Sequence, residues 1–164
     1  MIISIDGTGP RNADKLEEAA RFFATQLLHT RTTNKIELDL EIVKTLDVDG
    51  ECISEDDHKN PRYFTIRLKR APIDEMIKVL AHEMVHVKQY AKNELGKELA
   101  LARGGKGLRI VTRWQGEYWT PGTKEDEYWD APWEIAAYGM EVGLHHKWAS
   151  RHDPKMPWYV GAGA

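Results

Sequence analysis

The sequence has a single cysteine, Cys52, among 164 residues, so it can form neither an intramolecular disulfide nor a zinc site built from several thiolates. We expect Cys52 to be a small buried side chain in a strand rather than a nucleophile. The sequence also lacks a run of about 18 apolar residues, the length that a membrane-spanning helix requires, and it shows no secretory signal. Acidic and basic residues nearly balance, giving a net charge of -3 at pH 7. No nucleic-acid or membrane partner is therefore predicted, and we expect one cytoplasmic domain over residues 1–164.

The most informative stretch is an H-E-x-x-H motif that runs from His82 to His86, inside a segment at 72–94 that is predicted to be a helix. Its apolar residues recur at helical spacing at Ile73, Ile77, Leu80, Met84 and Val87. Two histidines four residues apart share one face of a helix, so both imidazoles can bind one Zn²⁺ ion. Glu83 then lies beside the metal, where a carboxylate can serve as general base. The competing interpretation is a pair of structural histidines on an ordinary amphipathic helix.

Alternating apolar and polar residues predict the strands of a small antiparallel sheet. The clearest strand covers 36–42, and Asp49-Gly50 is a hairpin signal that predicts an antiparallel return over 51–53. A further strand at 63–69 leads directly into the helix that carries the histidines. At the edge of the sheet, the unpaired backbone groups of that strand would be able to bind an extended peptide.

The N-terminal part of the chain is predicted to form one strand and one helix. A short apolar run at 1–5 can be a strand, and apolar spacing predicts a helix at 14–29. Asp14 and Glu17 match a capping box at the start of this helix. His29, at its end, would complement the negative end of the helix dipole.

Two polar segments resemble functional loops only superficially. Asp56 and Asp57 lie in the loop at 54–60, but adjacent carboxylates in loops are most often simply solvated. The glycine-rich segment at 97–107 lacks the Walker pattern that would bind phosphate. We expect a flexible connector there, with a flap over the site as one hypothesis.

Aromatic residues are concentrated in the second half of the chain. A hairpin is expected over 108–119 around Gln115-Gly116. All six tryptophans lie between Trp114 and Trp158. Because no basic stripe accompanies them, they are predicted to pack the domain rather than to bind nucleic acid.

A third metal ligand is needed, since catalytic zinc sites usually have three protein ligands and one open position. The segment at 131–148 is predicted to be a helix. Three of its residues fall within about 40° of Glu134 around the helix axis: Tyr138, Glu141 and His145. A buried carboxylate is costly unless it is paired or bound to metal. Glu134, Glu141 and His145 are the three candidate ligands, and Glu134 is preferred because it begins the helix and has a small neighbour in Ala137.

Two motifs together give the chain a resemblance to a known family. The H-E-x-x-H motif, followed by Pro132-Trp133-Glu134-Ile135-Ala136-Ala137, resembles the zincin metallopeptidases of the gluzincin type, in which a glutamate on a later helix is the third ligand. The chain is also similar to the small SprT-like and phage-borne zincins, over roughly 63–148. The resemblance implies a Zn²⁺ ion bound by His82, His86 and Glu134.

We therefore predict an α+β, zincin-like fold in which a small antiparallel sheet packs on the active-site helix and on the later glutamate helix. The implied function is a zinc peptidase that acts on a peptide or protein by metal-activated water, with Glu83 as general base. Tyr138 is a candidate hydrogen-bond donor to the oxyanion. The alternative function is a catalytically silent zincin-fold binding or regulatory module. The sequence departs from the family in lacking a cysteine-rich ribbon, a helix-supporting aspartate after the second motif, and the shorter spacing of thermolysin-like enzymes.

Overall fold

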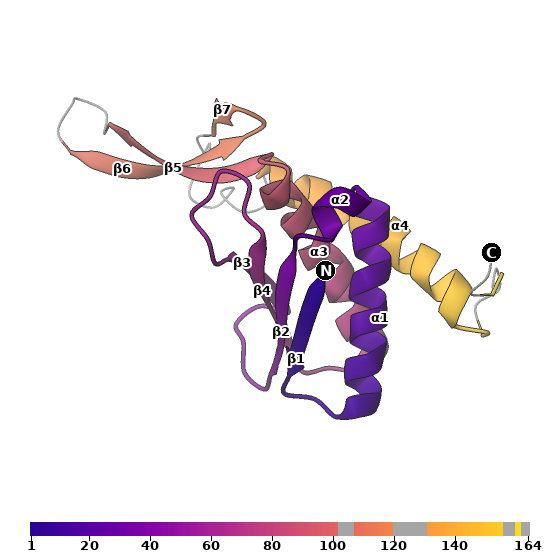
Figure 1. The fold of residues 1–164 in the computed structure, drawn as a ribbon. Helices are drawn as coiled ribbons and strands as arrows, with labels where there is room; N and C mark the ends of the chain where they lie inside the picture. Colours follow the sequence, from indigo (N-terminus) through magenta and orange to yellow (C-terminus); the bar gives the residue numbers. More distant parts are fainter. Residues whose placement is uncertain (102–106, 120–130, 156–159, 162–164) are drawn as a thin grey trace.

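The computed structural model describes residues 1–101, 107–119, 131–155 and 160–161, arranged as two sheets and several helices (Figure 1). The chain order is β1 (Ile2–Asp6), α1 (Pro10–Leu27), α2 (Thr30–Thr33), β2 (Glu37–Val43), β3 (Gly50–Ser54), β4 (Tyr63–Lys69), α3 (Ile73–Ala91), β5 (Leu95–Leu101), β6 (Leu108–Trp114), β7 (Glu117–Tyr118) and α4 (Pro132–His152). The fold is therefore of the α+β class, as predicted. None of the helices in these ranges is long and apolar enough to cross a membrane.

The first sheet has the strand order β1-β2-β4-β3 and is mixed rather than antiparallel. Strands β1, β2 and β4 run parallel, and only β3 is antiparallel to its neighbour β4. The predicted antiparallel hairpin between 36–42 and 51–53 is therefore wrong. Strand β4 is the most continuously buried of the four, which agrees with its position between β2 and β3, where both of its edges are paired.

A consequence of this order is that the strand leading into α3 does not lie at the edge. Strand β4 pairs with β2 on one side and with β3 on the other, so the prediction that 63–69 could offer a free edge to a peptide is wrong. The two edge strands of this sheet are β1 and β3, and β3 starts at Gly50. It packs against α3, so the free edge still borders that helix.

The N-terminal strand is confirmed, but the boundaries of the first helix differ from the prediction. Helix α1 begins at Pro10, with Gly9 as an N-cap that offers no side-chain hydrogen bond. Proline is well suited to the first helical position because its φ is already set and its missing N–H needs no partner there. The predicted capping box at Asp14 is therefore wrong. His29 instead caps α2, where its Nδ1 accepts a hydrogen bond from the backbone N–H of Arg31 at 3.2 Å.

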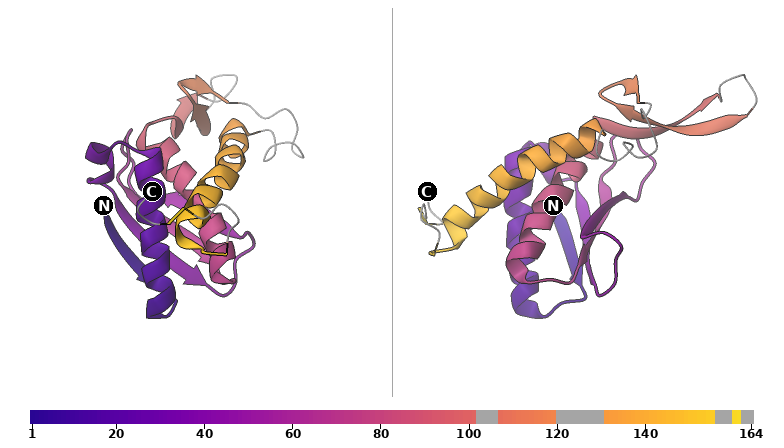
Figure 2. Two further views of the ribbon diagram at one scale, coloured as in Figure 1. Left: turned by 90° about the vertical axis from the view of Figure 1, so that its right-hand side faces the viewer. Right: turned by 180° about the vertical axis from the view of Figure 1, so that it is seen from behind.

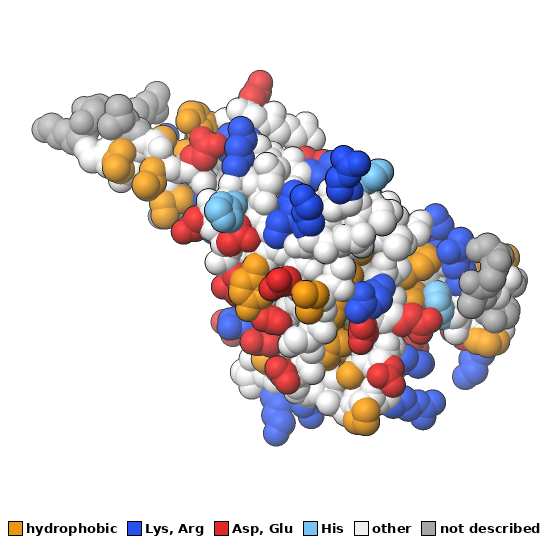
Figure 3. All heavy atoms as spheres, in the orientation of Figure 1, with side chains coloured by type: hydrophobic (Ala, Val, Ile, Leu, Met, Phe, Trp, Pro, Cys, Tyr) orange, Lys and Arg blue, Asp and Glu red, His pale blue; other side chains and the backbone are white. Residues whose placement is uncertain are grey.

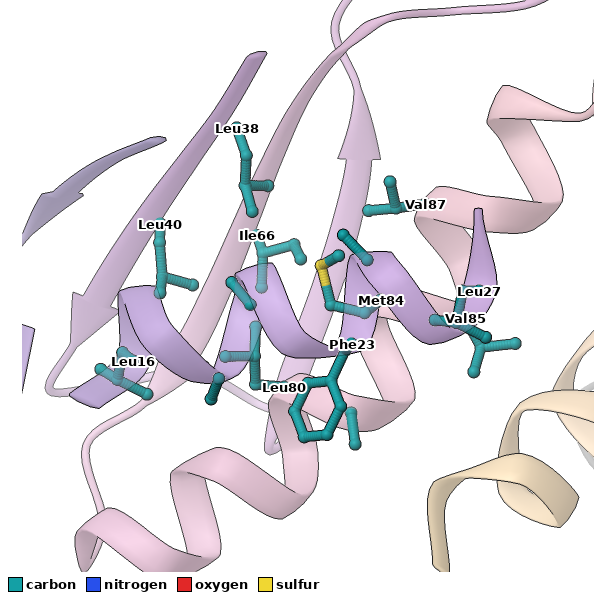
Figure 4. Close-up of a cluster of buried hydrophobic side chains, with 14 of the residues drawn as sticks. Leu16, Phe23, Leu27, Leu38, Leu40, Ile66, Leu80, Met84, Val85 and Val87 are labelled. Carbon is teal, nitrogen blue, oxygen red and sulfur yellow. The ribbon is translucent and has the colours of Figure 1, made fainter. Parts of the chain in front are cut away.

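The main core lies between the first sheet and the two helices α1 and α3 (Figure 4). Helix α1 contributes buried side chains at the predicted spacing, and the sheet contributes its inward-facing residues. Among the residues drawn are Leu16, Phe23, Leu38, Leu40, Ile66, Leu80 and Met84. Because Leu80 and Met84 anchor α3 in this core, the rotation of α3 about its axis is fixed.

The second sheet has the order β5-β6-β7 and projects away from the helices (Figures 1 and 2). Strand β5 pairs with β6 over its whole length, from Leu95 opposite Trp114 to Leu101 opposite Leu108. The prediction of a connector at 97–107 is thus wrong for 97–101, and 102–106 lie outside the described residues. The predicted hairpin around Gln115-Gly116 is confirmed, with φ angles of 49° and 93° that a tight hairpin turn requires.

Packing is confirmed as the role of the four described tryptophans. Trp133 contacts Trp114 and Trp119, with ring centroids 6.4 and 4.8 Å apart. Trp148 packs on Phe22 of α1 at 5.6 Å. Trp129 and Trp158 lie outside the described residues.

Candidate metal centre

Helix α3 turns its two histidines away from the core and towards α4. The imidazole rings of His82 and His86 are both buried, with centroids 4.9 Å apart, as expected for residues one turn apart. The same helix buries Met84 on the opposite side, against α1 and the sheet. The amphipathic pattern seen in the sequence thus fixes where the histidines point.

Helix α4 crosses α3 and brings Glu134 against both histidines. The Nε2 atom of His82 lies 3.3 Å from Oε2 of Glu134, and Nε2 of His86 lies 3.5 Å from Oε1. The two Nε2 atoms are themselves 3.1 Å apart. Within the described ranges, these three side chains are the one group of His, Cys, Asp or Glu residues placed to hold a metal ion, with ligand atoms within 4.8 Å of one another.

The spacing of these atoms fits a metal ion. Ligand atoms at the corners of a tetrahedron lie about 3.3 Å apart when the metal–ligand bonds are about 2.0 Å long. The contacts from His82 to His86 and to Glu134 measure 3.1 and 3.3 Å. Two imidazole nitrogens and one carboxylate also form a donor set that borderline-soft divalent ions prefer.

Neighbouring acceptors fix the tautomers of both histidines. Nδ1 of His82 lies 3.2 Å from Oε2 of Glu141, and Nδ1 of His86 lies 2.8 Å from Oε1 of Gln89. Gln89 cannot turn its amide round without loss, because its Nε2 donates to the Trp133 carbonyl at 2.9 Å. Both acceptors require a hydrogen on Nδ1, which leaves a lone pair on each Nε2. Two Nε2 lone pairs that face each other at 3.1 Å repel unless a proton or a metal ion lies between them.

The electrostatics of the metal-free site agree with this arrangement. Burial alone would lower the pKa of His86, but the carboxylates of Glu134 and Glu83 outweigh burial and the pKa is raised. Burial alone would raise the pKa of Glu134, but hydrogen bonds from both histidines, which each ring donates from Nε2 when it is protonated, outweigh burial and lower the pKa to about 2. The site therefore combines an ionised Glu134 carboxylate with a His86 imidazole whose charged form the neighbouring carboxylates favour.

Glu83 lies beside this group rather than in it, as predicted. Its carboxylate is almost fully buried. Burial raises the pKa of Glu83 to about 7, even though the neighbouring imidazoles favour the charged form. A carboxylate that exchanges a proton near neutral pH has the property that a general base needs.

The other predicted residues of the α4 stripe lie near the site in different positions. Glu141 contacts Nδ1 of His82, not the converging Nε2 atoms, and its other oxygen lies 3.3 Å from Nζ of Lys78. His145 is half-buried and is not part of the group that could hold a metal. The ring of Tyr138 packs edge-on against His82, with centroids 4.5 Å apart. Of the three candidate third ligands, Glu134 is therefore the one that the geometry places with the histidines.

A cavity of about 380 Å³ opens beside these residues. Its walls come from the start of β3 and from facing sides of α3 and α4, and they include Gly50, Lys78, Val79, His82, Glu83, Tyr138 and Glu141. Glu83 and His82 therefore face a space that a small segment of another molecule could enter.

Sequence reasoning missed two residues of the site. Gly50 was interpreted only as a turn residue, yet a Cβ atom there would lie 2.5 Å from Cγ1 of Val79 and 2.8 Å from Oε1 of Glu83. Gln89 was not singled out, although a glutamine on the face of a helix that also carries His86 is a polar residue that needs a partner when buried. Cys52, in contrast, lies in β3 as expected, and burial together with the nearby Glu83 raises the pKa of its thiol.

Comparison of the chain with protein-family models, with curated proteins and with solved structures found no match. The functional conclusion therefore depends on the geometry of the site.

Proposed function

We propose that this protein is a zinc-dependent metallopeptidase with a zincin-like fold, in which His82, His86 and Glu134 bind the metal. One observation carries the proposal: both Nδ1 atoms are hydrogen-bonded, so both Nε2 lone pairs point at the same place as the Glu134 carboxylate. Three protein ligands of the nitrogen and oxygen type, with room for one more, are the usual composition of a catalytic zinc site. The nearby cavity supplies that room.

The residues of the chain divide the chemistry between them. Zinc bound at this site would lower the pKa of a water molecule and polarise the substrate carbonyl. Glu83 takes a proton from the attacking water while the water oxygen bonds to the carbonyl carbon. Glu83 then gives that proton to the amine nitrogen as the C–N bond breaks. Tyr138, which packs on His82, is the proposed hydrogen-bond donor to the oxyanion.

Strand β3 is the proposed binding edge for the substrate backbone. It pairs only with β4 among the described strands, and it starts at Gly50, against Glu83. An extended peptide that adds to this edge would pass beside the general base. A peptide or protein substrate and a cytoplasmic location remain predictions from the sequence.

The test combines metal content with turnover. Zinc is supplied, excess is removed, and the bound metal is measured by inductively coupled plasma mass spectrometry, while turnover is followed on a library of fluorogenic peptides. We expect about one zinc per chain in the wild type and loss of zinc in Glu134→Ala. Glu83→Gln should keep its zinc and lose at least about 100-fold in turnover. Glu75→Gln, an exposed change on the same helix, should retain both.

Two results would contradict the proposal. A wild-type protein that holds no metal under these conditions would leave the histidines as structural residues. Bound zinc combined with turnover that does not depend on Glu83 would exclude Glu83 as general base, and bound zinc with no turnover on any peptide would favour the alternative of a silent zincin-fold binding module.

A further inference from the structure

Strands β5 and β6 form a two-stranded ribbon, here called the arm, that extends from the body of the molecule. Its base is firmly attached. Leu95 is buried, and Trp114 directly opposite it contacts Trp133, the residue before Glu134. Arg113 contacts Glu98 and Asn93 and so ties the two strands to the end of α3.

One face of the arm packs on the body of the molecule near the base of the arm. Farther from the body, the same face is exposed to solvent. Residues alternate between faces along a strand, and directly paired residues share a face. Leu95 and Leu99 therefore lie on one face with Trp114, Ile110 and Leu108. Leu99, Leu108 and Ile110 are 68%, 65% and 72% exposed, and they form what we call the apolar face of the arm. Hydrophobic side chains gather along the projecting ribbon in Figure 3.

The arm begins where the proposed substrate edge ends. Strand β3 runs from Gly50, beside Glu83, to Ser54. The connection that follows it folds back onto the end of α3, where Asn60 and Arg62 donate hydrogen bonds to the Ala91 carbonyl at 3.3 and 2.9 Å. Strand β5 starts only a few residues after Ala91. A polypeptide lying along β3 in this direction would therefore reach the base of the arm.

The size of the apolar face argues against a second copy of the chain as its occupant. Three exposed side chains offer at most a few hundred Å² of apolar surface, whereas a stable protein–protein interface buries about 800 Å² on each partner. A single extended polypeptide segment needs no such area, because its backbone can pair with β3 at the same time.

We propose that the apolar face of the arm binds an apolar stretch of the same extended polypeptide that lies along β3. The inference rests on the proposed peptidase function and specifies its substrate class: unfolded or extended polypeptides with an apolar stretch outside the cleavage region. A seven-residue strand spans about 23 Å, so short peptides would occupy β3 without reaching the outer part of the arm.

The experiment measures binding in zinc-loaded Glu83→Gln protein, so that turnover does not interfere. Two fluorescein-labelled peptides of about 20 residues have one half of their sequence in common. In the other half, the leucine-containing peptide alternates leucine and threonine, whereas the glycine–serine peptide alternates glycine and serine. Leu99→Thr, Leu108→Thr and Ile110→Thr are combined, because threonine preserves strand propensity. The matched control is Arg109→Thr, on the opposite face of the arm.

We expect the combined variant to bind the leucine-containing peptide at least about 10-fold more weakly, given the loss of three apolar contacts. Binding of the glycine–serine peptide should be unchanged, and Arg109→Thr should bind both peptides as the parent protein does. Ile110→Thr alone, a smaller perturbation of the fold, should show a weaker effect in the same direction.

Equal binding of the leucine-containing peptide by the parent protein and both variants would overturn the proposal. The proposal would also be overturned if the combined variant kept its peptide affinity but no longer bound phosphatidylcholine vesicles. The same holds if it kept its peptide affinity but lost a dimer that the parent protein forms in sedimentation equilibrium. Failure of the peptidase proposal is distinguishable, because it would appear as absent turnover in wild type while arm-dependent peptide binding persists.

Discussion

Nδ1 of His82 lies 3.2 Å from Oε2 of Glu141, although the two residues are 59 positions apart in the chain. Oε1 of the same carboxylate lies 3.3 Å from Nζ of Lys78, one turn before His82 on α3. The Glu141 carboxylate therefore contacts the imidazole on the side away from Nε2, and Lys78 forms an ion pair with that carboxylate. Such outer partners orient a ligating histidine and raise its basicity.

Replacing Glu141 with alanine should weaken zinc binding without removing the ligand set. We expect a loss of about 10- to 100-fold in zinc affinity, the usual effect of deleting a partner of a ligating histidine. Competition with a chromophoric chelator measures this. Lys78→Met, which removes only the support of Glu141, should have a smaller effect. Complete loss of zinc, equal to that of Glu134→Ala, would instead make Glu141 a ligand.

Replacing Gln89 with leucine should affect both stability and metal binding. Gln89 is fully buried and joins Nδ1 of His86 to the Trp133 carbonyl, so leucine leaves Nδ1 of His86 without its acceptor and removes a second buried hydrogen bond. The expected loss is about 2 kcal/mol in the free energy of unfolding of the metal-free protein, which corresponds to a fall of roughly 4–8 °C in Tm.

The control for this change is Gln26→Leu, because Gln26 lies on the surface of α1. Its Tm should stay within about 2 °C of wild type, because surface changes usually alter the free energy of unfolding by about 0.5 kcal/mol or less. Unchanged zinc affinity in Gln89→Leu would show that His86 keeps its tautomer without this glutamine.

Glu83→Gln should stabilise the metal-free protein at alkaline pH. Because burial raises the pKa of Glu83 from 4.5 to about 7, the folded state holds this proton more tightly than the unfolded state. The contribution of the protonated Glu83 to the free energy of unfolding is therefore complete below about pH 4.5 and is lost as the pH rises through about 7. Glutamine cannot ionise, so denaturant unfolding should show a gain that grows to about 3 kcal/mol by pH 8. A gain of equal size at pH 4 would point to packing instead of ionisation.

Gly50→Ala should displace Glu83 and reduce turnover while the protein keeps its zinc. The new Cβ would lie 2.8 Å from Oε1 of Glu83 and 2.5 Å from Cγ1 of Val79, and neither contact is tolerable without movement. Adding Val79→Ala relieves only the second contact, so the double variant should regain stability but not activity. Thermal unfolding and peptide turnover separate the two effects.

A matched glycine on α4 controls for the Gly50 change. A Cβ at Gly143 would meet no other atom within 4 Å. Gly143→Ala should therefore raise the free energy of unfolding by about 0.5–1 kcal/mol, because alanine is the better helix former. Full recovery of turnover in the Gly50→Ala and Val79→Ala double variant would show that Val79, and not Glu83, makes the glycine necessary.

Local patterns predicted the helices well and the sheet poorly. The spacing of apolar residues on α3 is set by the helical repeat within one segment, so it could be read without knowing any partner. The pairing of β3 with β4 instead of β2 depends on which strand best fills the middle of the sheet, and the Asp49-Gly50 turn signal does not contain that information. Strand β5 was missed for a similar reason, since it is a strand only because β6 lies alongside it.

The sequence alone determined the proposed ligand pair and the proposed base, because His82, Glu83 and His86 lie within two turns of one helix whose apolar face fixes its rotation. It also determined that one face of α4 would present carboxylates. Only the tertiary structure decided which carboxylate meets the Nε2 atoms and which supports a histidine from behind, since the crossing of α3 and α4 places Glu134 and Glu141 on different sides of the His82 ring. The close approach of Gly50 to Glu83 was likewise decided in space, by packing of the edge strand on α3.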